Sequence, residues 1–476
     1  MSRLLRSAIF SGNTVRSTSG RTVASLRRDS INCGPIPRCC RYSSKLSPSA
    51  SASASASASA SAALRPTPSD LQASAAYRDS LPVCAVDKKR VMIGWDTRTW
   101  SRFHHVWLRD HCRCTKCFHQ ITKQRLVNTF EIPADIEPLE VAPTAEGLSV
   151  TWSGTQPHLS IYPWSWLQSN SYDPPLEHAR SSQEKVLWGS KIQQHPPAVS
   201  YEEVMNPDDK GLHKWLLKID EFGFCFVNGV PPTPEATEEL SMRIGFIRET
   251  QYGKFWDFTS DLAKGDTAYT TLALGAHTDN TYFTDPCGIQ LFHLLSHTGG
   301  TGGATLLVDG FYVASILRAT HPSVYSLLSR VPVIAHAAGE PGALYIPSPS
   351  SGYPVLGHGR VTGELVQVRW NNDDRSVVKG VTGDEMEEWY NAIRVWHKLL
   401  TSPDSEYWVQ LSAGTAVAVD NHRVLHGRSA FDGKRRMCGA YIGIDEYKSK
   451  LTVLQERFEI NLPQVVQGRS IWHPHI

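Results

Sequence analysis

The sequence predicts a mainly β protein, in which a jelly-roll core with flanking helices follows a small β-rich N-terminal domain. Two observations lead to this prediction. Short runs rich in β-branched and aromatic residues recur from about residue 89 onward and are separated by turn-forming residues. Several longer segments have helical patterning and lie between such runs, so helices are expected to flank the sheets of a jelly-roll.

The composition is that of an ordinary globular protein. Of the 476 residues, 41% are hydrophobic and 20% are charged, and the formal net charge is +2. A charge this close to zero indicates no nucleic-acid partner. No apolar run is long enough to span a bilayer, so no membrane span is expected. The ten cysteines occur in a chain too long for a small secreted disulfide scaffold, and we expect reduced thiols.

The N-terminal segment has the composition of an address followed by a spacer. Residues 1–45 are rich in Arg and Ser, and Asp29 is their only acidic residue. This pattern is typical of a mitochondrial transit peptide, which places the protein in the mitochondrial matrix. The alternative is a disordered basic tail without an address. Residues 46–80 include a nearly pure Ser-Ala alternation, which cannot build a core and is expected to be a disordered linker.

Residues 81–175 are expected to form the small β-rich domain. Its predicted strands are Val91–Trp95, Leu126–Ile132 and Leu148–Trp152, with turn residues between them. A domain of this size can bury only a small hydrophobic core, so a structural metal would offset the deficit.

Three thiols in this domain indicate such a metal. Cys112, Cys114 and Cys117 lie within six residues, a spacing that suits tetrahedral zinc. A closed structural site needs a fourth ligand. Spacing leaves His111, His119 and His158 open, although a ligand adjacent to Cys112 would be strained, which disfavours His111. The alternative is a cluster of free thiols.

The jelly-roll is predicted within residues 195–476. A helix is expected over residues 233–246, where Thr233 can act as the N-cap and Pro234 can occupy the first helical position. The other predicted elements are helices at residues 211–221 and 384–400 and a strand at Phe222–Val227.

A His-x-Asp pair predicts a second metal site. If His277 and Asp279 lie on a strand, both side chains point to the same face and can reach one ion. A further histidine would complete a 2-His-1-carboxylate triad, which leaves three positions open on Fe(II) for a cosubstrate and O₂. His426 and His422 are the candidates, and His426 is preferred because Gly427 follows it. The chemistry would take place at the iron, so no catalytic side chain is assigned.

An arginine after the triad predicts the cosubstrate. Arg435 and Arg436 lie within one strand's length of His426. A guanidinium there can make a bidentate pair with the distal carboxylate of 2-oxoglutarate. The hydroxyl of Thr305 could bind the same carboxylate.

Three sequence blocks, at residues 277–293, 299–312 and 419–428, together resemble the γ-butyrobetaine dioxygenase family of Fe(II)- and 2-oxoglutarate-dependent oxygenases. The resemblance covers roughly residue 85 to the C-terminus. It implies a double-stranded β-helix as the jelly-roll core, Fe(II), 2-oxoglutarate, O₂ and ascorbate, and an N-terminal zinc domain. His422 stands where the family commonly has an aromatic residue, a change not expected to affect the metal.

The resemblance also implies particular roles for residues. It assigns the structural zinc to Cys112, Cys114, Cys117 and His158. It assigns 2-oxoglutarate to Arg435, with Arg436 as the fallback.

The resemblance implies a substrate with a quaternary ammonium group. Such a group has no N–H to donate, so aromatic rings must hold it. The family's aromatic cage matches Tyr252, Trp256 and Tyr269, and the first two would share one face if their stretch were helical. Asp266 could pair with a substrate α-ammonium, and Asn372 resembles the family's contact to the substrate carboxylate.

The expected activity is therefore hydroxylation of N6,N6,N6-trimethyl-L-lysine at C3, which gives 3-hydroxytrimethyllysine in the first step of carnitine biosynthesis. The alternatives are hydroxylation of γ-butyrobetaine on the same scaffold, and a non-catalytic protein that binds methylated ammonium groups. The sequence leaves open whether the protein forms a homodimer.

Overall fold

The structure is a computed structural model, and it describes residues 82–154, 156–176, 185–259, 270–337, 347 and 351–458. The predicted leader and linker lie outside the described residues, as do Asp266 and Tyr269. In the described part of the chain, no helix is both long and apolar enough to cross a membrane.

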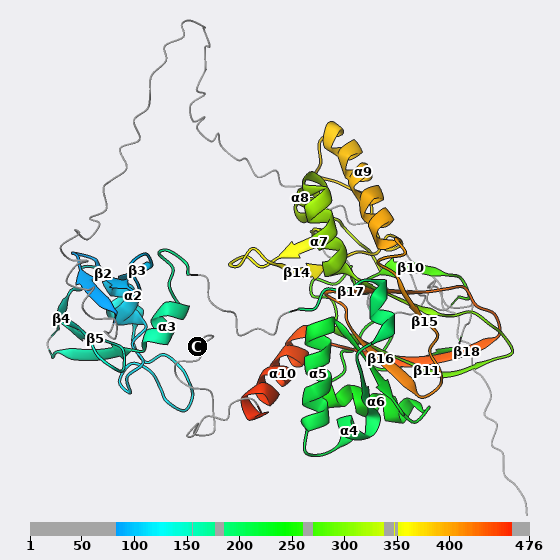
Figure 1. Ribbon diagram of the computed structural model, residues 1–476, viewed down its shortest axis with the longest axis horizontal. Coiled ribbons are helices and arrows are strands. Elements are labelled where there is room, and N and C mark those ends of the chain that lie inside the picture. The colour runs from blue at the N-terminus through cyan, green and yellow to red at the C-terminus, as the bar shows by residue number, and fades with distance from the viewer. Residues whose placement is uncertain are drawn as a thin grey trace, which may run out of the picture. The chain divides into compact units, whose positions relative to one another are not determined.

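The N-terminal part contains two three-stranded antiparallel sheets packed around one core (Figure 1). Val91, Phe103, Val150 and Trp152 are fully buried in this core. The sheets are β1 (Val83–Val86), β2 (Arg90–Gly94) and β3 (Trp100–His104), and β4 (Pro138–Pro143), β5 (Leu148–Trp152) and β6 (His158–Tyr162), accompanied by the short helices α2 (His105–Asp110) and α3 (Trp164–Ser169).

Two of the three strands predicted here are confirmed, as β2 and β5. The prediction of a strand at Leu126–Ile132 was wrong. This stretch contains a single 3-10 turn, Thr129–Glu131, in which the side chain of Asn128 accepts a hydrogen bond from the Phe130 amide. Of the apolar residues that suggested a strand, Leu126 is 52% exposed and Phe130 is 96% exposed, and Ile132 is partly buried against the core of the domain.

The C-terminal part is built on two facing sheets. The larger has the order β7-β8-β16-β11-β18-β9, and the smaller has the order β10-β17-β12-β15. The larger sheet comprises β7 (Ala198–Ser200), β8 (Phe224–Asn228), β9 (Trp256–Thr259), β11 (Ile289–Thr298), β16 (Thr415–Asp420) and β18 (Lys434–Ile442). The smaller comprises β10 (Leu274–His277), β12 (Thr305–Asp309), β15 (Tyr407–Val409) and β17 (Val424–Arg428), and a separate hairpin pairs β13 (Leu356–His358) with β14 (Leu365–Val368).

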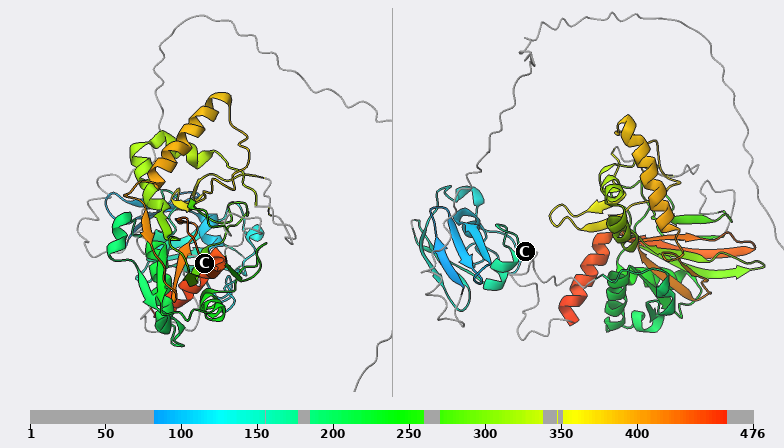
Figure 2. Two further views of the ribbon diagram at one scale, coloured as in Figure 1. Left: turned by 90° about the vertical axis from the view of Figure 1, so that its right-hand side faces the viewer. Right: turned by 45° about the horizontal axis from the view of Figure 1, so that its top comes forward.

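Helices cover the outer faces of both sheets (Figures 1 and 2). Against the larger sheet pack α4 (Tyr201–Met205), α5 (Lys210–Phe222), α6 (Pro234–Ile244) and α10 (Ile444–Phe458). Against the smaller sheet pack α7 (Gly310–Thr320), α8 (Pro322–Arg330) and α9 (Gly383–Leu400). A third cluster fills the space between the sheets and includes Phe224, Leu307 and Val417. The arrangement is the predicted jelly-roll with flanking helices.

The predicted helices are confirmed as α5, α6 and α9, and the predicted strand as β8. The N-terminus of α6 forms as expected, because the side chain of Thr233 accepts a hydrogen bond from the Ala236 amide at 3.2 Å and Pro234 is the first helical residue.

Candidate active site

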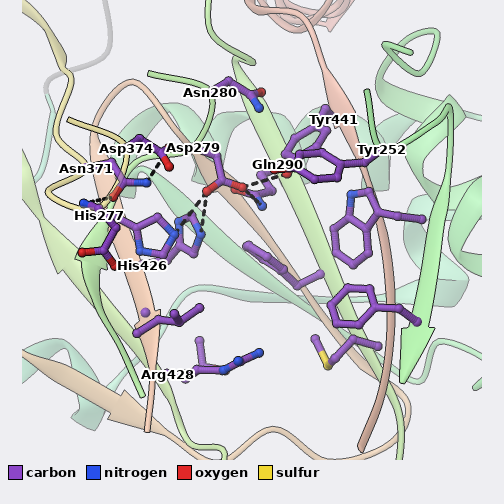
Figure 3. Close-up of a pocket in the computed structure, with 18 of the residues that line it drawn as sticks. Tyr252, His277, Asp279, Asn280, Gln290, Asn371, Asp374, His426, Arg428 and Tyr441 are labelled. Carbon is purple, nitrogen blue, oxygen red and sulfur yellow. Dashed lines mark hydrogen bonds and ion pairs between the residues drawn. The ribbon is translucent and has the colours of Figure 1, made fainter. Parts of the chain in front are cut away.

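The three residues predicted to bind iron come together between the two sheets. The Nε2 atom of His277 lies 3.2 Å from Oδ1 of Asp279, and Nε2 of His426 lies 3.6 Å from the same oxygen (Figure 3). His277 ends β10, and its Cα partner on β17 is His426. The strand stops at His277, and Asp279 approaches from the turn that follows. The prediction that both residues lie on one continuous strand was therefore wrong.

The geometry of the triad suits a metal ion. Nδ1 of His277 is 2.8 Å from the Gly275 carbonyl, which can only accept, so Nδ1 carries a proton and Nε2 is the nitrogen that faces the candidate metal position. The three candidate ligand atoms lie within 4.8 Å of one another. Neighbouring ligand atoms on an octahedral ion with bonds of roughly 2.1 Å lie about 3 Å apart, so small side-chain adjustments would bring all three into contact with one ion.

Electrostatics keep Asp279 ionised and His426 neutral. Burial, together with the charge of His277, lowers the pKa of His426 to about 3, so its imidazole is neutral at physiological pH. Burial alone would raise the pKa of Asp279, but its contact with His277 and the positive charge that the two histidines can carry hold this pKa well below its usual range. Burial alone would lower the pKa of His277, but the same contact with Asp279 raises it. The ligand set is therefore a carboxylate with at least one neutral imidazole.

His422 is placed away from the triad. Its Nε2 atom lies 3.4 Å from the carbonyl of Pro286, and the residue is not part of the cluster that could hold a metal. Of the two histidines left open by the sequence, the structure brings only His426 to Asp279.

Two buried arginines lie at one end of the same cavity. Arg435 on β18 and Arg428 on β17 both line it, together with Thr305 on β12. Burial and, to a smaller extent, repulsion from Arg428 lower the pKa of Arg435 to about 10, so its guanidinium stays charged at neutral pH. The Nε atom of Arg435 is buried and has no hydrogen-bond partner among the described residues. A buried guanidinium of this kind calls for an anionic ligand.

Arg436 faces the other side of β18, because neighbouring residues on a strand alternate between its faces. It makes an ion pair with Asp257 on β9, with Nε 2.9 Å from Oδ1. The structure therefore brings Arg435 into the cavity and leaves Arg436 outside it.

Two of the predicted cage residues also line the cavity. Tyr252 and Trp256 are among its lining residues, but they do not share a helical face: Tyr252 lies in a turn and Trp256 begins β9. The stretch is not helical, so the condition for a shared helical face is not met. The ring of Trp256 crosses Gly439 on β18, where an added Cβ would lie 2.3 Å from it. Only glycine leaves room for the ring at that point.

Asn372, the predicted contact to the substrate carboxylate, does not line the cavity. Its side chain is exposed, whereas Asn371 lines the cavity and donates a 2.8 Å hydrogen bond to Asp374. The positions of Asp266 and Tyr269 lie outside the described residues.

Several lining residues were missed by the sequence analysis. Arg428 is two residues after His426 on β17, so the alternation of a strand could have placed both on one face. Gln290 is a polar residue within the apolar run that begins at Ile289, and it contacts Asp279. Tyr441 and Tyr282 also line the cavity but gave no local signal, because their roles depend on packing between distant segments.

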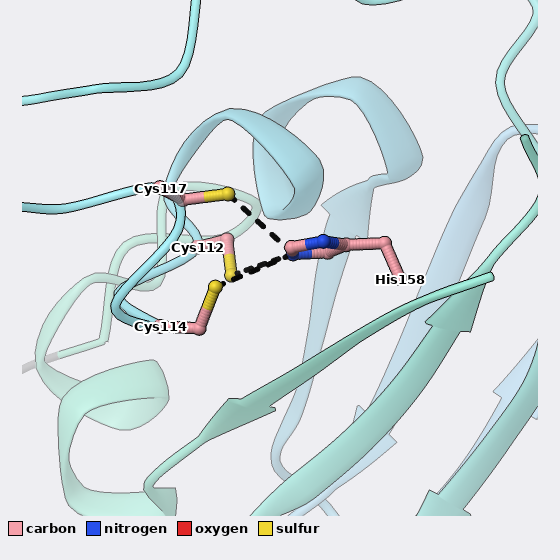
Figure 4. Close-up of side chains that lie close together, drawn as sticks. All are labelled: Cys112, Cys114, Cys117 and His158. Atoms are coloured by element: carbon pink, nitrogen blue, oxygen red, sulfur yellow. Dashed lines mark hydrogen bonds between the residues drawn. The ribbon is translucent and has the colours of Figure 1, made fainter. Parts of the chain in front are cut away.

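The second predicted metal site also comes together. Nε2 of His158, at the start of β6, lies 3.3, 3.6 and 3.4 Å from the sulfur atoms of Cys112, Cys114 and Cys117, respectively (Figure 4). A tetrahedral zinc with Zn–S and Zn–N bonds of about 2.3 and 2.0 Å places sulfur and nitrogen about 3.5 Å apart, so these four residues fit the ion. The pKa of the Cys117 thiol is lowered mainly by its hydrogen bond with Cys112. Arg109 donates to the Cys117 sulfur at 3.2 Å and lowers this pKa further.

The other two histidines considered for this site point elsewhere. His111 is 2.8 Å from the carbonyl of Trp107 and stacks on its ring, whereas His119 accepts a hydrogen bond from the Thr122 amide.

Comparison with known families agrees with this architecture. Residues 183–441 match the family model described as taurine catabolism dioxygenase TauD, TfdA family, and residues 84–168 match the model described as gamma-butyrobetaine hydroxylase-like, N-terminal. The chain belongs to the TauD, TfdA family of dioxygenases.

Within that family, the protein is similar to trimethyllysine dioxygenases over most of their length. It is 42% identical to that of Meyerozyma guilliermondii, over 77% of this chain and 94% of the relative. It is 42% identical to the mitochondrial trimethyllysine dioxygenase of Homo sapiens, over 73% of this chain and 82% of the relative. The identity to the gamma-butyrobetaine dioxygenase of Pseudomonas sp. is lower, at 32%, over 77% of this chain and 94% of the relative.

Proposed function

We propose that the protein hydroxylates N6,N6,N6-trimethyl-L-lysine at C3, using Fe(II), 2-oxoglutarate and O₂. The observation that carries this proposal is a single cavity that holds the His277–Asp279–His426 triad together with the buried guanidinium of Arg435 and the aromatic rings of Tyr252 and Trp256. The greater similarity to trimethyllysine dioxygenases than to the gamma-butyrobetaine enzyme supports this choice of substrate. The reaction is the first step of carnitine biosynthesis.

His277, Asp279 and His426 would hold the iron. When bound there with 2-oxoglutarate, the ion would supply O₂-dependent oxidation of a C–H bond. Arg435 would pair with the distal carboxylate of the cosubstrate, and the hydroxyl of Thr305 would donate to it. Both residues are more than nine-tenths buried, so water would be excluded from these contacts.

Tyr252 and Trp256 would hold the trimethylammonium group through their ring faces, each contact contributing about 0.5–2 kcal/mol. Tyr269 would complete this cage. Asn371 replaces Asn372 as the proposed contact to the substrate carboxylate, because only Asn371 lines the cavity. Asp266 would pair with the α-ammonium, a group that γ-butyrobetaine lacks.

We propose the domain division 81–175 and 195–476, with a structural zinc in the first domain, held by its three thiols and His158. Residues 1–45 would act as the mitochondrial transit peptide and 46–80 as a linker. The mammalian relatives are named mitochondrial, which supports a matrix location.

The proposed function is tested by mass spectrometry of trimethyllysine and γ-butyrobetaine, each incubated with the purified protein, Fe(II), 2-oxoglutarate and ascorbate. Trimethyllysine is expected to gain one oxygen, with fragment ions placing it at C3. Faster turnover of γ-butyrobetaine would favour the alternative activity. Binding of trimethyllysine without oxygen gain or succinate formation would favour a non-catalytic binding protein.

Substrate choice is expected to depend on Asp266. The Asp266→Asn variant removes the charge that would pair with the α-ammonium, so KM for trimethyllysine should rise by roughly tenfold or more, since a hydrogen-bonded charge is worth about 1.5–3 kcal/mol. Turnover of γ-butyrobetaine should be unchanged or improved, because this substrate has no α-ammonium. Steady-state kinetics on both substrates measure the effect, and full retention of trimethyllysine activity would contradict the assignment.

Removal of the zinc site is expected to unfold the N-terminal domain. The Cys114→Ala variant should lose one zinc per chain in elemental analysis, and the loss of the metal should lower the melting temperature, because the ion compensates for a small core. Cys84→Ala is the matched control, since Cys84 lies on β1 outside the cluster. Equal zinc content in Cys114→Ala and wild type would rule out the proposed ligand.

A further inference from the structure

The two oxygens of Asp279 have different environments (Figure 3). Oδ1 faces the Nε2 atoms of His277 and His426. Oδ2 accepts one hydrogen bond from Nε2 of Gln290 at 2.6 Å and another from the hydroxyl of Tyr441 at 2.8 Å. The carboxylate is therefore divided between a side that faces the candidate metal and a side that faces two donors.

The donors come from neighbouring strands of the larger sheet. Gln290 on β11 and Tyr441 on β18 are direct cross-strand partners, so their side chains leave the sheet side by side on the face that looks into the cavity. Gln290 is 2% exposed and Tyr441 is 6% exposed. Burial of a glutamine amide costs free energy unless it is hydrogen-bonded, so the contact with Asp279 offsets part of this cost, while Oε1 of Gln290 has no partner among the described residues.

The main chain of Asp279 is held separately. The side chain of Asn421 accepts a 2.7 Å hydrogen bond from the Asp279 amide and donates a 3.0 Å bond to its carbonyl. Because the backbone is fixed in this way, the remaining freedom of Asp279 is the rotation of its carboxylate, and the two donors act on that rotation.

We propose that Gln290 and Tyr441 are positioning residues that keep Asp279 a one-oxygen ligand of the metal. This inference rests on the proposed iron site. An oxygen of a carboxylate has about two lone-pair sites, and both sites of Oδ2 are filled by the two donors. With one oxygen and two nitrogens as protein ligands, an octahedral ion keeps three open positions, enough for two cosubstrate oxygens and O₂. If Asp279 bound through both oxygens, only two positions would remain.

The test measures Fe(II) binding under anaerobic conditions in wild type, Tyr441→Phe and Gln290→Met. Tyr441→Phe keeps the ring and removes only the donor, and Gln290→Met keeps the side-chain length. Each is expected to weaken Fe(II) affinity by about 10- to 100-fold, the effect typical of losing a partner of a metal ligand. Each should also alter the absorbance band of the Fe(II)–2-oxoglutarate complex and raise the amount of 2-oxoglutarate consumed per substrate hydroxylated. A structural role alone would not change the spectrum.

The matched control is Tyr282→Phe, which removes a phenol from the same cavity. The hydroxyl of Tyr282 accepts from Gln251 at 2.8 Å and lies 3.4 Å from the hydroxyl of Tyr252, so neither of these contacts involves Asp279. Its variant should bind Fe(II) as wild type does. Wild-type affinity, spectrum and coupling in both test variants, or an equal loss in the control, would overturn the inference. Absence of Fe(II) binding in wild type, or full binding in His277→Ala, would instead refute the iron site itself.

Discussion

Replacement of His426 by alanine is expected to abolish Fe(II) binding and hydroxylation, whereas His422→Ala should leave both at the wild-type level. Loss of a residue that merely supports a metal ligand costs about 10- to 100-fold in affinity or activity, and loss of a ligand should cost more. The geometry of the triad explains why His426→Ala should lose the metal. His426 supplies one of the three atoms that converge near Oδ1 of Asp279, and its neutral imidazole has the lone pair that a metal requires.

His422 is a matched control because it lies on the same chain segment and was the competing candidate from sequence. Its side chain has one long contact, 3.4 Å to the carbonyl of Pro286, and the hydrogen bonds that it makes to Val368 and Asp420 use only its backbone. Alanine therefore preserves the local structure. The measurements are Fe(II) stoichiometry by anaerobic titration and oxygen incorporation by mass spectrometry. An active His426→Ala protein, or an inactive and metal-free His422→Ala protein, would contradict the assignment.

The candidate triad could be predicted from sequence because its chemistry is carried by local spacing. A His-x-Asp pair places two ligands within one short segment, and a histidine followed by glycine marks the third. The residues alone leave the cosubstrate arginine open between Arg435 and Arg436, and only the family resemblance prefers Arg435, because alternation along a strand says that one of them faces inward but not which one. The cross-strand pairing of β18 with β11 and β9 fixes that choice in the structure.

Other features depended on contacts that no local pattern encodes. The run Leu126–Ile132 has the composition of a strand, but it pairs with no strand among the described residues, and most of its side chains stay exposed. Tyr252 and Trp256 are four residues apart and would share one face only on a helix, but Trp256 lies on a strand and pairs with Gly439 across 183 positions of the chain. The donors to Asp279 were missed for the same reason. Tyr441 lies 162 residues from Asp279 in sequence, and only the folded sheet brings the two together.

The Arg435→Met variant is expected to lose its affinity for 2-oxoglutarate while keeping its fold. Truncation of one partner in a buried, hydrogen-bonded charge pair costs about 2–5 kcal/mol, which corresponds to a rise of roughly 30- to 4000-fold in KM for 2-oxoglutarate. The matched control is Arg436→Met, which breaks only the ion pair with Asp257. The side chain of Arg436 is 45% exposed in this pair. That variant should keep a wild-type KM, because exposed pairs contribute little.

Stability measured without ligand separates binding from folding in this experiment. In the absence of 2-oxoglutarate, Arg435 is a buried cation close to Arg428, and its Nε atom has no partner among the described residues. Its replacement by methionine should therefore leave the melting temperature of the unliganded protein unchanged or higher, because an uncompensated buried charge destabilises the fold. Added 2-oxoglutarate and Fe(II) should raise the melting temperature of wild type and Arg436→Met but not that of Arg435→Met. If Arg435→Met were stabilised by 2-oxoglutarate as strongly as wild type, the guanidinium would have another role, and Arg428 would be the next candidate for the cosubstrate carboxylate.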